Sequence, residues 1–128
     1  MSARVRVLVV DDEPDMCWAL ESILRLAGYA VTTALSGAQA LAVVQQTAFP
    51  VAFLDAKLPD MDGRDLAMQV RRISPGTAIV LVSGYYYSED AYVADGLRKG
   101  LFVAFLAKPF DLRQVRQTIQ RAMEICHG

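Results

Sequence analysis

Residues 51–63 read VAFLDAKLPDMDG, a short apolar run that ends in a carboxylate and continues into turn-forming residues. The run is too short for a helix and follows Pro50, so it predicts a buried strand that opens into a loop at Asp55. A carboxylate at the end of a buried strand is a candidate site residue. The alternative is that Asp55 only caps the next helix or starts a turn, as aspartate often does.

Apolar runs and amphipathic stretches alternate along the rest of the chain. The expected strands are Val5–Val10, Tyr29–Ala34, Val51–Leu54, Ala78–Val82 and Leu101–Ala107. The expected helices begin near Pro14, Ser36, Gly63, Ser88 and Asp111, and they end near Gly28, Val44, Ile73, Lys99 and Cys126. Gly96 is unfavourable inside the fourth helix by ~1 kcal/mol. The alternation predicts an α/β fold, a doubly wound five-stranded parallel sheet with five helices on its two faces.

Length and composition favour one domain with neither a nucleic-acid nor a membrane role. The 128 residues, 54% of them hydrophobic, fit a single domain over residues 1–128 with its core at about 4–125. Thirteen basic and fourteen acidic residues give a net charge of -1, which disfavours nucleic-acid binding by this chain. No run reaches the ~18 apolar residues of a membrane span or resembles a signal peptide. Cys17 and Cys126 form no metal-binding pattern, which suits reduced thiols in a cytoplasmic protein.

Polar residues follow four of the five expected strands. Asp11 and Asp12 follow the first strand, Asp55 the third, Ser83 the fourth and Lys108 the fifth. Ligands of such sheets bind outside the carboxyl ends of the strands, where the strand order switches. If the order is 2-1-3-4-5, the first and third strands are neighbours and their carboxylates converge.

Three converging carboxylates raise at least one pKa unless they share a cation. An acidic cluster without His or Cys favours Mg²⁺ over Zn²⁺. With the Ser83 hydroxyl and the Lys108 ammonium, such a site can hold a phosphoryl group, and Asp55 can act as the nucleophile that forms an acyl phosphate. Taken singly, the other residues could be helix caps, a turn serine and a solvated lysine. Their coincidence at matching strand ends favours a site.

Four motifs together resemble the receiver domain of two-component response regulators over essentially the whole chain. They are DDEP at 11–14, Asp55 with LPDMDG at 58–63, VSG at 82–84 and KPF at 108–110. The resemblance implies that Asp55 accepts a phosphoryl group from a phosphohistidine on a sensor histidine kinase or a phosphotransfer protein. It also implies that Asp11 or Asp12, Asp55 and the backbone carbonyl of Lys57 bind Mg²⁺.

The resemblance further implies a conformational switch. Ser83 would be the switch hydroxyl and Phe105 the switch aromatic, biased toward an inward position. The peptide bond between Lys108 and Pro109 would be cis, which X-Pro bonds adopt at small cost.

Two positions near the site depart from the usual pattern of the family. Lys57 stands two residues after Asp55, and Tyr85 stands two residues after Ser83. They place a cation and an aromatic ring at positions that resemble the family's tuners of phosphoryl lifetime. The segment from Tyr85 to Phe105 is also slightly longer than expected for the family.

The predicted function is a phosphoacceptor signalling switch of a two-component phosphorelay, with a flavodoxin-like fold of strand order 2-1-3-4-5. It would be a regulatory domain with at most self-phosphorylation and slow autodephosphorylation. The fourth helix, fifth strand and fifth helix would form its output face, which would bind an effector or a second copy after phosphorylation. The residues expected on that face are Tyr86, Tyr87, Leu101 and Phe102.

Two alternatives from other classes remain at this point. One is an aspartate-nucleophile phosphohydrolase, although such an enzyme is expected to carry an acidic residue where Lys57 stands. The other is a phosphorylation-independent, receiver-like scaffold. The complete set of acidic, hydroxyl and lysine residues disfavours this second alternative.

Overall fold

The structure, a computed structural model, describes residues 4–85 and 90–127 and alternates strands with helices throughout them. The strands are β1 (Arg6–Val10), β2 (Ala30–Ala34), β3 (Val51–Asp55), β4 (Ala78–Ser83) and β5 (Ala104–Ala107). The helices are α1 (Pro14–Leu26), α2 (Gly37–Gln46), α3 (Gly63–Ile73), α4 (Ala91–Arg98) and α5 (Leu112–His127). Tyr86, Tyr87, Ser88, Glu89 and the side chain of Cys126 lie outside the described residues.

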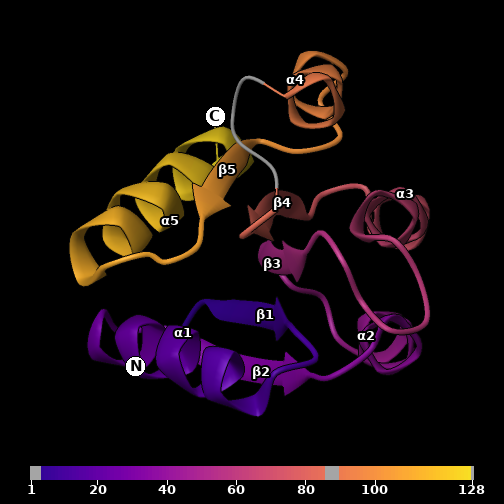
Figure 1. Cartoon of the computed structure of the whole chain (residues 1–128). Coiled ribbons are helices and arrows are strands. Elements are labelled where there is room, and N and C mark those ends of the chain that lie inside the picture. The colour runs from indigo at the N-terminus through magenta and orange to yellow at the C-terminus, as the bar shows by residue number, and fades with distance from the viewer. Residues whose placement is uncertain (1–3, 86–89, 128) are drawn as a thin grey trace.

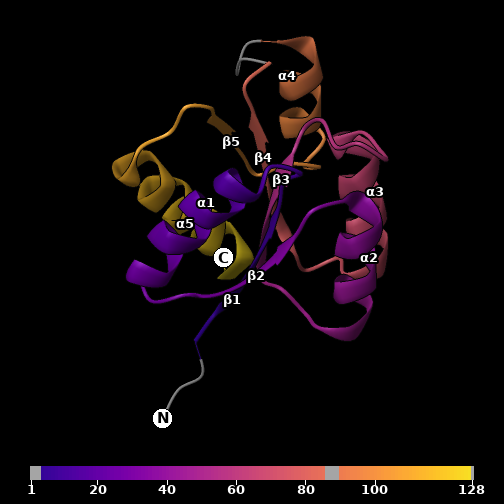
Figure 2. The same cartoon turned by 60° about the horizontal axis from the view of Figure 1, so that its bottom comes forward.

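The five strands form one parallel sheet in the order β2-β1-β3-β4-β5, which confirms the predicted α/β class and strand order. Helices α1 and α5 cover one face of this sheet, and α2, α3 and α4 cover the other (Figures 1 and 2). The two outer layers enclose β1, β3 and β4 between them, so these strands are almost entirely buried. Continuous apolar runs are the expected sequence pattern for strands covered on both faces.

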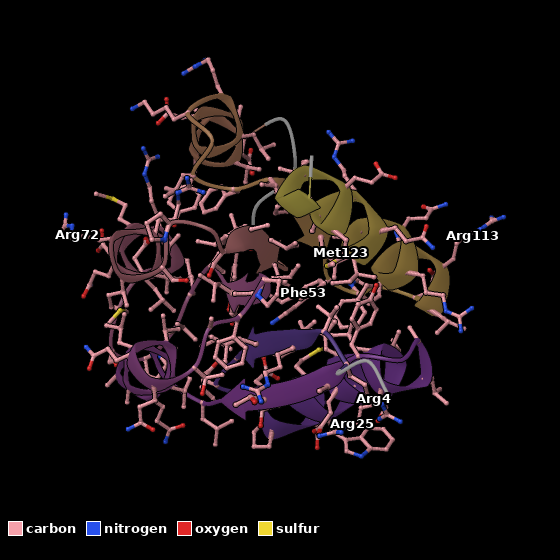
Figure 3. The ribbon with its side chains drawn as sticks, turned by 180° about the vertical axis from the view of Figure 1, so that it is seen from behind. Arg4, Arg25, Phe53, Arg72, Arg113 and Met123 are labelled. Atoms are coloured by element: carbon pink, nitrogen blue, oxygen red, sulfur yellow. The ribbon has the colours of Figure 1, made fainter. Side chains whose placement is uncertain are left out.

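Successive side chains of β3 enter two separate hydrophobic cores. Val51 and Phe53 pack toward α1 and α5, whereas Ala52 and Leu54 pack toward α2 and α3. Figure 3 shows Phe53 at the centre of the molecule, while arginines such as Arg72 point outward at the periphery. The alternation follows from the two-residue period of a strand and fixes which way Asp55 points at the end of β3.

Local sequence signals determine several helix ends. Pro14 occupies the first turn of α1, and Gly28 has a φ of 100° just after its end, a conformation that favours glycine. Ser36 caps α2 because its Oγ accepts a hydrogen bond from the Gln39 N–H at 3.2 Å. None of the helices in the described part of the chain combines the length and apolar character needed to cross a membrane.

The structure corrects the predicted fifth strand. Pairing with β4 begins at Ala104 rather than Leu101, because the N–H groups of Leu101 and Phe102 both donate to the Gly96 carbonyl at the end of α4. The Phe102 side chain is only 1% exposed, so the prediction that it lies on the output face is wrong. A Cβ at Gly96 would overlap the Phe102 ring, which explains a glycine inside this helix.

Helix α4 begins after Asp90 and is fastened to the start of α3. Asp95 accepts hydrogen bonds at 2.7 Å from Arg64 of α3 and from Arg98 of its own helix. Hydrogen bonds from Arg64 above all, then from Lys99 and Arg98, lower the pKa of Asp95 to about 2. The Tyr92 hydroxyl also donates to Asp62, the N-cap of α3. Thus α4 is tied to the loop that follows β3.

Candidate functional site

The register of the sheet brings Asp11 and Asp55 together. Val10 of β1 pairs with Leu54 of β3, so the next residues along the two strands are the two aspartates. The Asp11 N–H donates to the Ala34 carbonyl of β2 at 3.1 Å, so the backbone at the end of β1 is fixed by its neighbouring strand. Both carboxylates therefore project from a rigid edge of the sheet.

Asp12 completes an acidic cluster with these two residues. One carboxylate oxygen each from Asp11, Asp12 and Asp55 lies within 4.8 Å of the others. Asp11 and Asp55 are buried, whereas Asp12 is exposed, so the cluster is open to solvent on one side. Carboxylate oxygens with room for water are what Mg²⁺ prefers, and the residues present therefore fit such an ion.

Lys108 approaches the cluster from the other side. Its N–H donates to the Ser83 carbonyl at 2.9 Å, which extends the pairing of β4 and β5 by one residue. Its Nζ lies 2.7 Å from Oδ2 of Asp11 and 3.6 Å from Oδ2 of Asp55. Burial alone would lower the pKa of Lys108, but the hydrogen bond to Asp11 and the two negative charges raise it. The side chain is therefore a cation, and its peptide bond to Pro109 is cis.

The surroundings of Asp55 favour the protonated form of its carboxyl group. Burial, followed by the charge of Asp11, raises its pKa to about 6. The charge of Lys108 and a hydrogen bond from the Lys57 N–H act in the opposite direction and do not cancel the effect. A cation bound at the site would therefore stabilise the ionised form of Asp55.

A cleft over Asp55 is walled by residues of the four loops that follow β1, β3, β4 and β5. Ser83 is buried at the end of β4, and its Oγ accepts a hydrogen bond from the Tyr85 N–H at 2.9 Å. The Lys57 ammonium lies 4.6 Å from the centroid of the Tyr85 ring, within the range of a cation–π contact. The residues that line this cleft are Asp12, Glu13, Asp55, Lys57, Leu58, Pro59, Gly84, Tyr85 and Lys108.

Phe105 lies apart from this cleft. It pairs with Leu81 of β4, is half-buried, and packs against the core on the side of α4. It also lines a groove between α4 and α5, together with Leu97 and Arg121. The structure thus places the expected switch aromatic on the edge strand β5, within the expected output face.

Sequence reasoning missed the contacts that two residues make near the site. Cys17 is buried beneath the acidic cluster, and its S–H donates to the Asp11 carbonyl at 3.3 Å. Burial and the charge of Asp11 raise the pKa of Cys17 to about 11, so it is a neutral thiol. Its spacing to Leu20 and Leu24 is the signal that places it on the buried face of α1. The second residue, Asp60, makes only long-range contacts, which no local pattern reveals.

With this geometry established, comparison with known proteins identifies the class. Residues 7–120 match the response regulator receiver domain, and the chain belongs to this family of two-component signalling domains. It is 30% identical to the transcriptional regulatory protein ZraR of Salmonella typhimurium (strain LT2) over 120 residues, which cover 94% of this chain and 26% of that protein. This chain therefore spans about a quarter of the length of that relative.

Solved structures are similar over nearly the whole chain. A CheY-like receiver domain protein from Methanospirillum hungatei JF-1 matches with a TM-score of 0.89 and 26% identity, and the match covers 98% of both chains. The beryllofluoride-activated NtrC4 receiver domain dimer matches with a TM-score of 0.85 and 32% identity, covering 94% of this chain and 98% of that one. These similarities agree with the observed strand order and with a regulatory signalling domain.

Proposed function

We propose that this chain is a phosphoacceptor switch in which Asp55 receives a phosphoryl group from a histidine kinase or a phosphotransfer protein. The observation that carries the proposal is the position of Asp55 beside Asp11, Asp12 and Lys108 at the carboxyl ends of adjacent strands. Membership of the receiver family supports it. The same family membership favours regulation over a phosphohydrolase. The complete set of acidic, hydroxyl and lysine residues disfavours a scaffold without phosphorylation.

Asp55, Lys108 and Ser83 each have a role in the proposed phosphoryl transfer. A carboxylate oxygen of Asp55 forms a bond to phosphorus while the bond from phosphorus to the donor imidazole nitrogen breaks. The electron pair stays on the imidazole, which takes up a proton from water. Lys108 is near enough to Asp55 to neutralise charge on the transferred oxygens, and the Ser83 hydroxyl can donate to one of them after a local movement.

Asp11, Asp12, Asp55 and the Lys57 carbonyl would hold Mg²⁺ in this site. The cluster geometry supports the three carboxylates, and the place of Lys57 two residues after the end of β3 supports the carbonyl. When bound, the ion supplies positive charge that stabilises the phosphoryl oxygens during transfer. The exposed Asp12 leaves the approach to Asp55 open for the donor.

Incubation with acetyl phosphate and Mg²⁺, followed by intact mass measurement, tests the proposal. The native protein should gain one phosphoryl mass, and Asp55→Asn should gain none because the amide is not a nucleophile. Asp65→Asn, on the exposed face of α3, is the matched control and should behave as the native protein. Labelling of Asp55→Asn would reject Asp55 as the acceptor. Continuous phosphate release at high turnover would favour the phosphohydrolase.

We also propose that phosphorylation changes the face formed by α4, β5 and α5. Asp62 and Tyr92 link the loop after β3 to α4, and Phe105 lies in the groove beside this helix. The Tyr92–Asp62 hydrogen bond supports a path from the loop after β3 to α4, and the groove beside Phe105 offers space in which this ring could repack. NtrC4 is described as a dimer in its beryllofluoride-activated form, which supports self-association as one output.

Sedimentation with and without beryllofluoride tests the output face. Addition of beryllofluoride and Mg²⁺ should increase association or alter amide exchange on α4 and α5. Phe105→Ala should reduce the response, whereas Met68→Ala, an exposed apolar residue on α3, should leave it unchanged. If beryllofluoride binds and neither quantity changes, the output face lies elsewhere.

A further inference from the structure

We infer that Asp60 is a positioning residue for the proposed metal and phosphoryl site, because it fastens the loop that carries Lys57 to helix α2. The inference rests on the proposed function and adds a residue that lies outside the acidic cluster. Asp60 is exposed and does not line the cleft, so its influence on Asp55 would act through the backbone. Three sets of contacts carry the argument.

The loop after β3 is closed on itself. Lys57 and Asp62 form an antiparallel bridge, and the Leu58 N–H donates to the Met61 carbonyl at 3.2 Å. Residues 58–61 are thus a tight turn at the end of a two-stranded stem. Asp60 lies in this turn, and Lys57 lies in the stem close to the acidic cluster.

The base of the stem is packed against Asp55. The Gly63 N–H donates to the Ala56 carbonyl at 2.8 Å, and a Cβ at Gly63 would overlap the Asp55 carbonyl oxygen. The Lys57 N–H is hydrogen-bonded to the Asp55 carboxylate. Any displacement of the stem therefore changes the surroundings of that carboxylate and the direction of the Lys57 carbonyl.

The tip of the loop is bound to the start of α2 (Figure 1). Oδ1 of Asp60 accepts from the Gly37 N–H at 2.9 Å, and Oδ2 accepts from the Ala38 N–H at 3.0 Å. The Met61 thioether fills the space beside Gly37, where an added Cβ would lie 2.5 Å from its Sδ. A carboxylate at a helix N-terminus is also favoured by the helix dipole. The tip is therefore held by two charge-assisted hydrogen bonds and a close van der Waals contact.

Helix α2 already has a local cap, which separates two interpretations of Asp60. Ser36 precedes the helix and satisfies the Gln39 N–H through its own hydroxyl. If Asp60 only stabilised the start of α2, removing its side chain should have the same effect on the site as removing that of Ser36. If it positions the loop, its removal should affect the site while that of Ser36 should not.

The test compares Mg²⁺ affinities of the native protein, Asp60→Ala, Asp60→Asn and Ser36→Ala. Affinity is measured by titration followed through the backbone amide resonances of residues 55–63, without any phosphoryl donor. Partners that orient metal ligands typically matter at the level of tenfold or more, so Asp60→Ala should weaken Mg²⁺ binding by about tenfold. Asp60→Asn keeps one acceptor oxygen and should lose less, which keeps the test valid if the alanine variant fails to fold.

The measured Mg²⁺ affinities decide whether Asp60 positions the loop. Weaker binding in the Asp60 variants with native binding in Ser36→Ala supports the positioning role. Native affinity in both Asp60 variants, or an equal loss in Ser36→Ala, overturns it. Absence of Mg²⁺ binding by the native protein overturns the proposed function and this inference with it, and that failure is recognised because it appears before any substitution is made.

Discussion

Lys108 Nζ lies 2.7 Å from Asp11 Oδ2, and this partly buried ion pair joins residues that are 97 positions apart in the sequence. Lys108 is 0.9 Å farther from Asp55, as the 3.6 Å distance between Nζ and Oδ2 indicates. Asp55 is consequently the less stabilised of the two buried carboxylates. In the unphosphorylated protein, the negative charge of Asp55, the residue proposed to react, is therefore only partly compensated.

The first prediction is that Asp55→Asn stabilises the protein at neutral pH in the absence of Mg²⁺. The folded-state pKa of about 6 lies above the ordinary 3.8, so the folded protein binds the Asp55 proton more tightly than the unfolded chain. This contribution to stability is complete below pH ~4 and is lost as the pH rises through about 6. The amide of asparagine does not ionise, so Asp55→Asn does not lose stability in this pH range. Its free energy of unfolding at pH 7.5 should therefore exceed that of the native protein by about 2 to 3 kcal/mol.

Denaturant unfolding at several pH values measures this effect. The difference between Asp55→Asn and the native protein should shrink as the pH falls from 6 to 4. Asp65→Asn, which removes an exposed carboxylate of α3, is the control for the loss of one negative charge. A native protein at least as stable as the Asn variant at pH 7.5 would contradict the prediction.

The second prediction concerns the exposed member of the acidic cluster. Mg²⁺ at ten times its dissociation constant should stabilise the native protein by about 1.4 kcal/mol, because a ligand bound only by the folded state adds its binding free energy. Asp12→Ala should remove most of this gain, since it deletes one of three carboxylates. Thermal unfolding with and without Mg²⁺ provides the measurement. Asp15→Ala, an exposed carboxylate of α1, is the control and should keep the full gain.

The third prediction is that Gly96→Ala destabilises the protein although alanine is the better helix former. The added methyl group would overlap the Phe102 ring, and overpacking of a core typically costs about 1–3 kcal/mol. Gly76→Ala is the matched control, because no atom lies within 4 Å of its Cβ position and its φ is not positive. Denaturant unfolding should separate the two variants. The cost of Gly96→Ala should fall in a Phe102→Leu background if the ring is its cause.

Sequence reasoning succeeded where structure follows from local sequence patterns, and it failed where structure depends on contacts between residues far apart in the sequence. The strands β1, β3 and β4 were predictable because both faces are covered and their apolar runs are continuous. Alternation predicted a parallel sheet but does not by itself fix the strand order, and the observed order β2-β1-β3-β4-β5 brings Asp11 and Asp55 together. The start of β5 was predicted wrongly because an apolar run does not distinguish a strand residue from Phe102, which packs beneath a helix. The role inferred for Asp60 depends on contacts to residues 22 and 23 positions away.

The last prediction concerns how long a phosphoryl group would remain on Asp55. Hydrolysis requires water to reach phosphorus, and the Tyr85 ring and the Lys57 side chain stand at the mouth of the cleft. Both residues are exposed, and Tyr85 retains 72% of its accessible surface, so their contact should contribute only about 0.5–1 kcal/mol.

That energy converts to a factor of roughly two to five in rate, since 1.36 kcal/mol corresponds to tenfold. Tyr85→Ala should therefore shorten the half-life of the phosphorylated protein by about two- to fivefold, measured by intact mass after removal of the donor. Tyr85→Phe keeps the ring over the Lys57 ammonium and should retain the native half-life. If the Phe variant loses the phosphoryl group as fast as the Ala variant, the hydroxyl rather than the ring protects it. A longer half-life in Tyr85→Ala would mean that the ring orders the attacking water instead of excluding it.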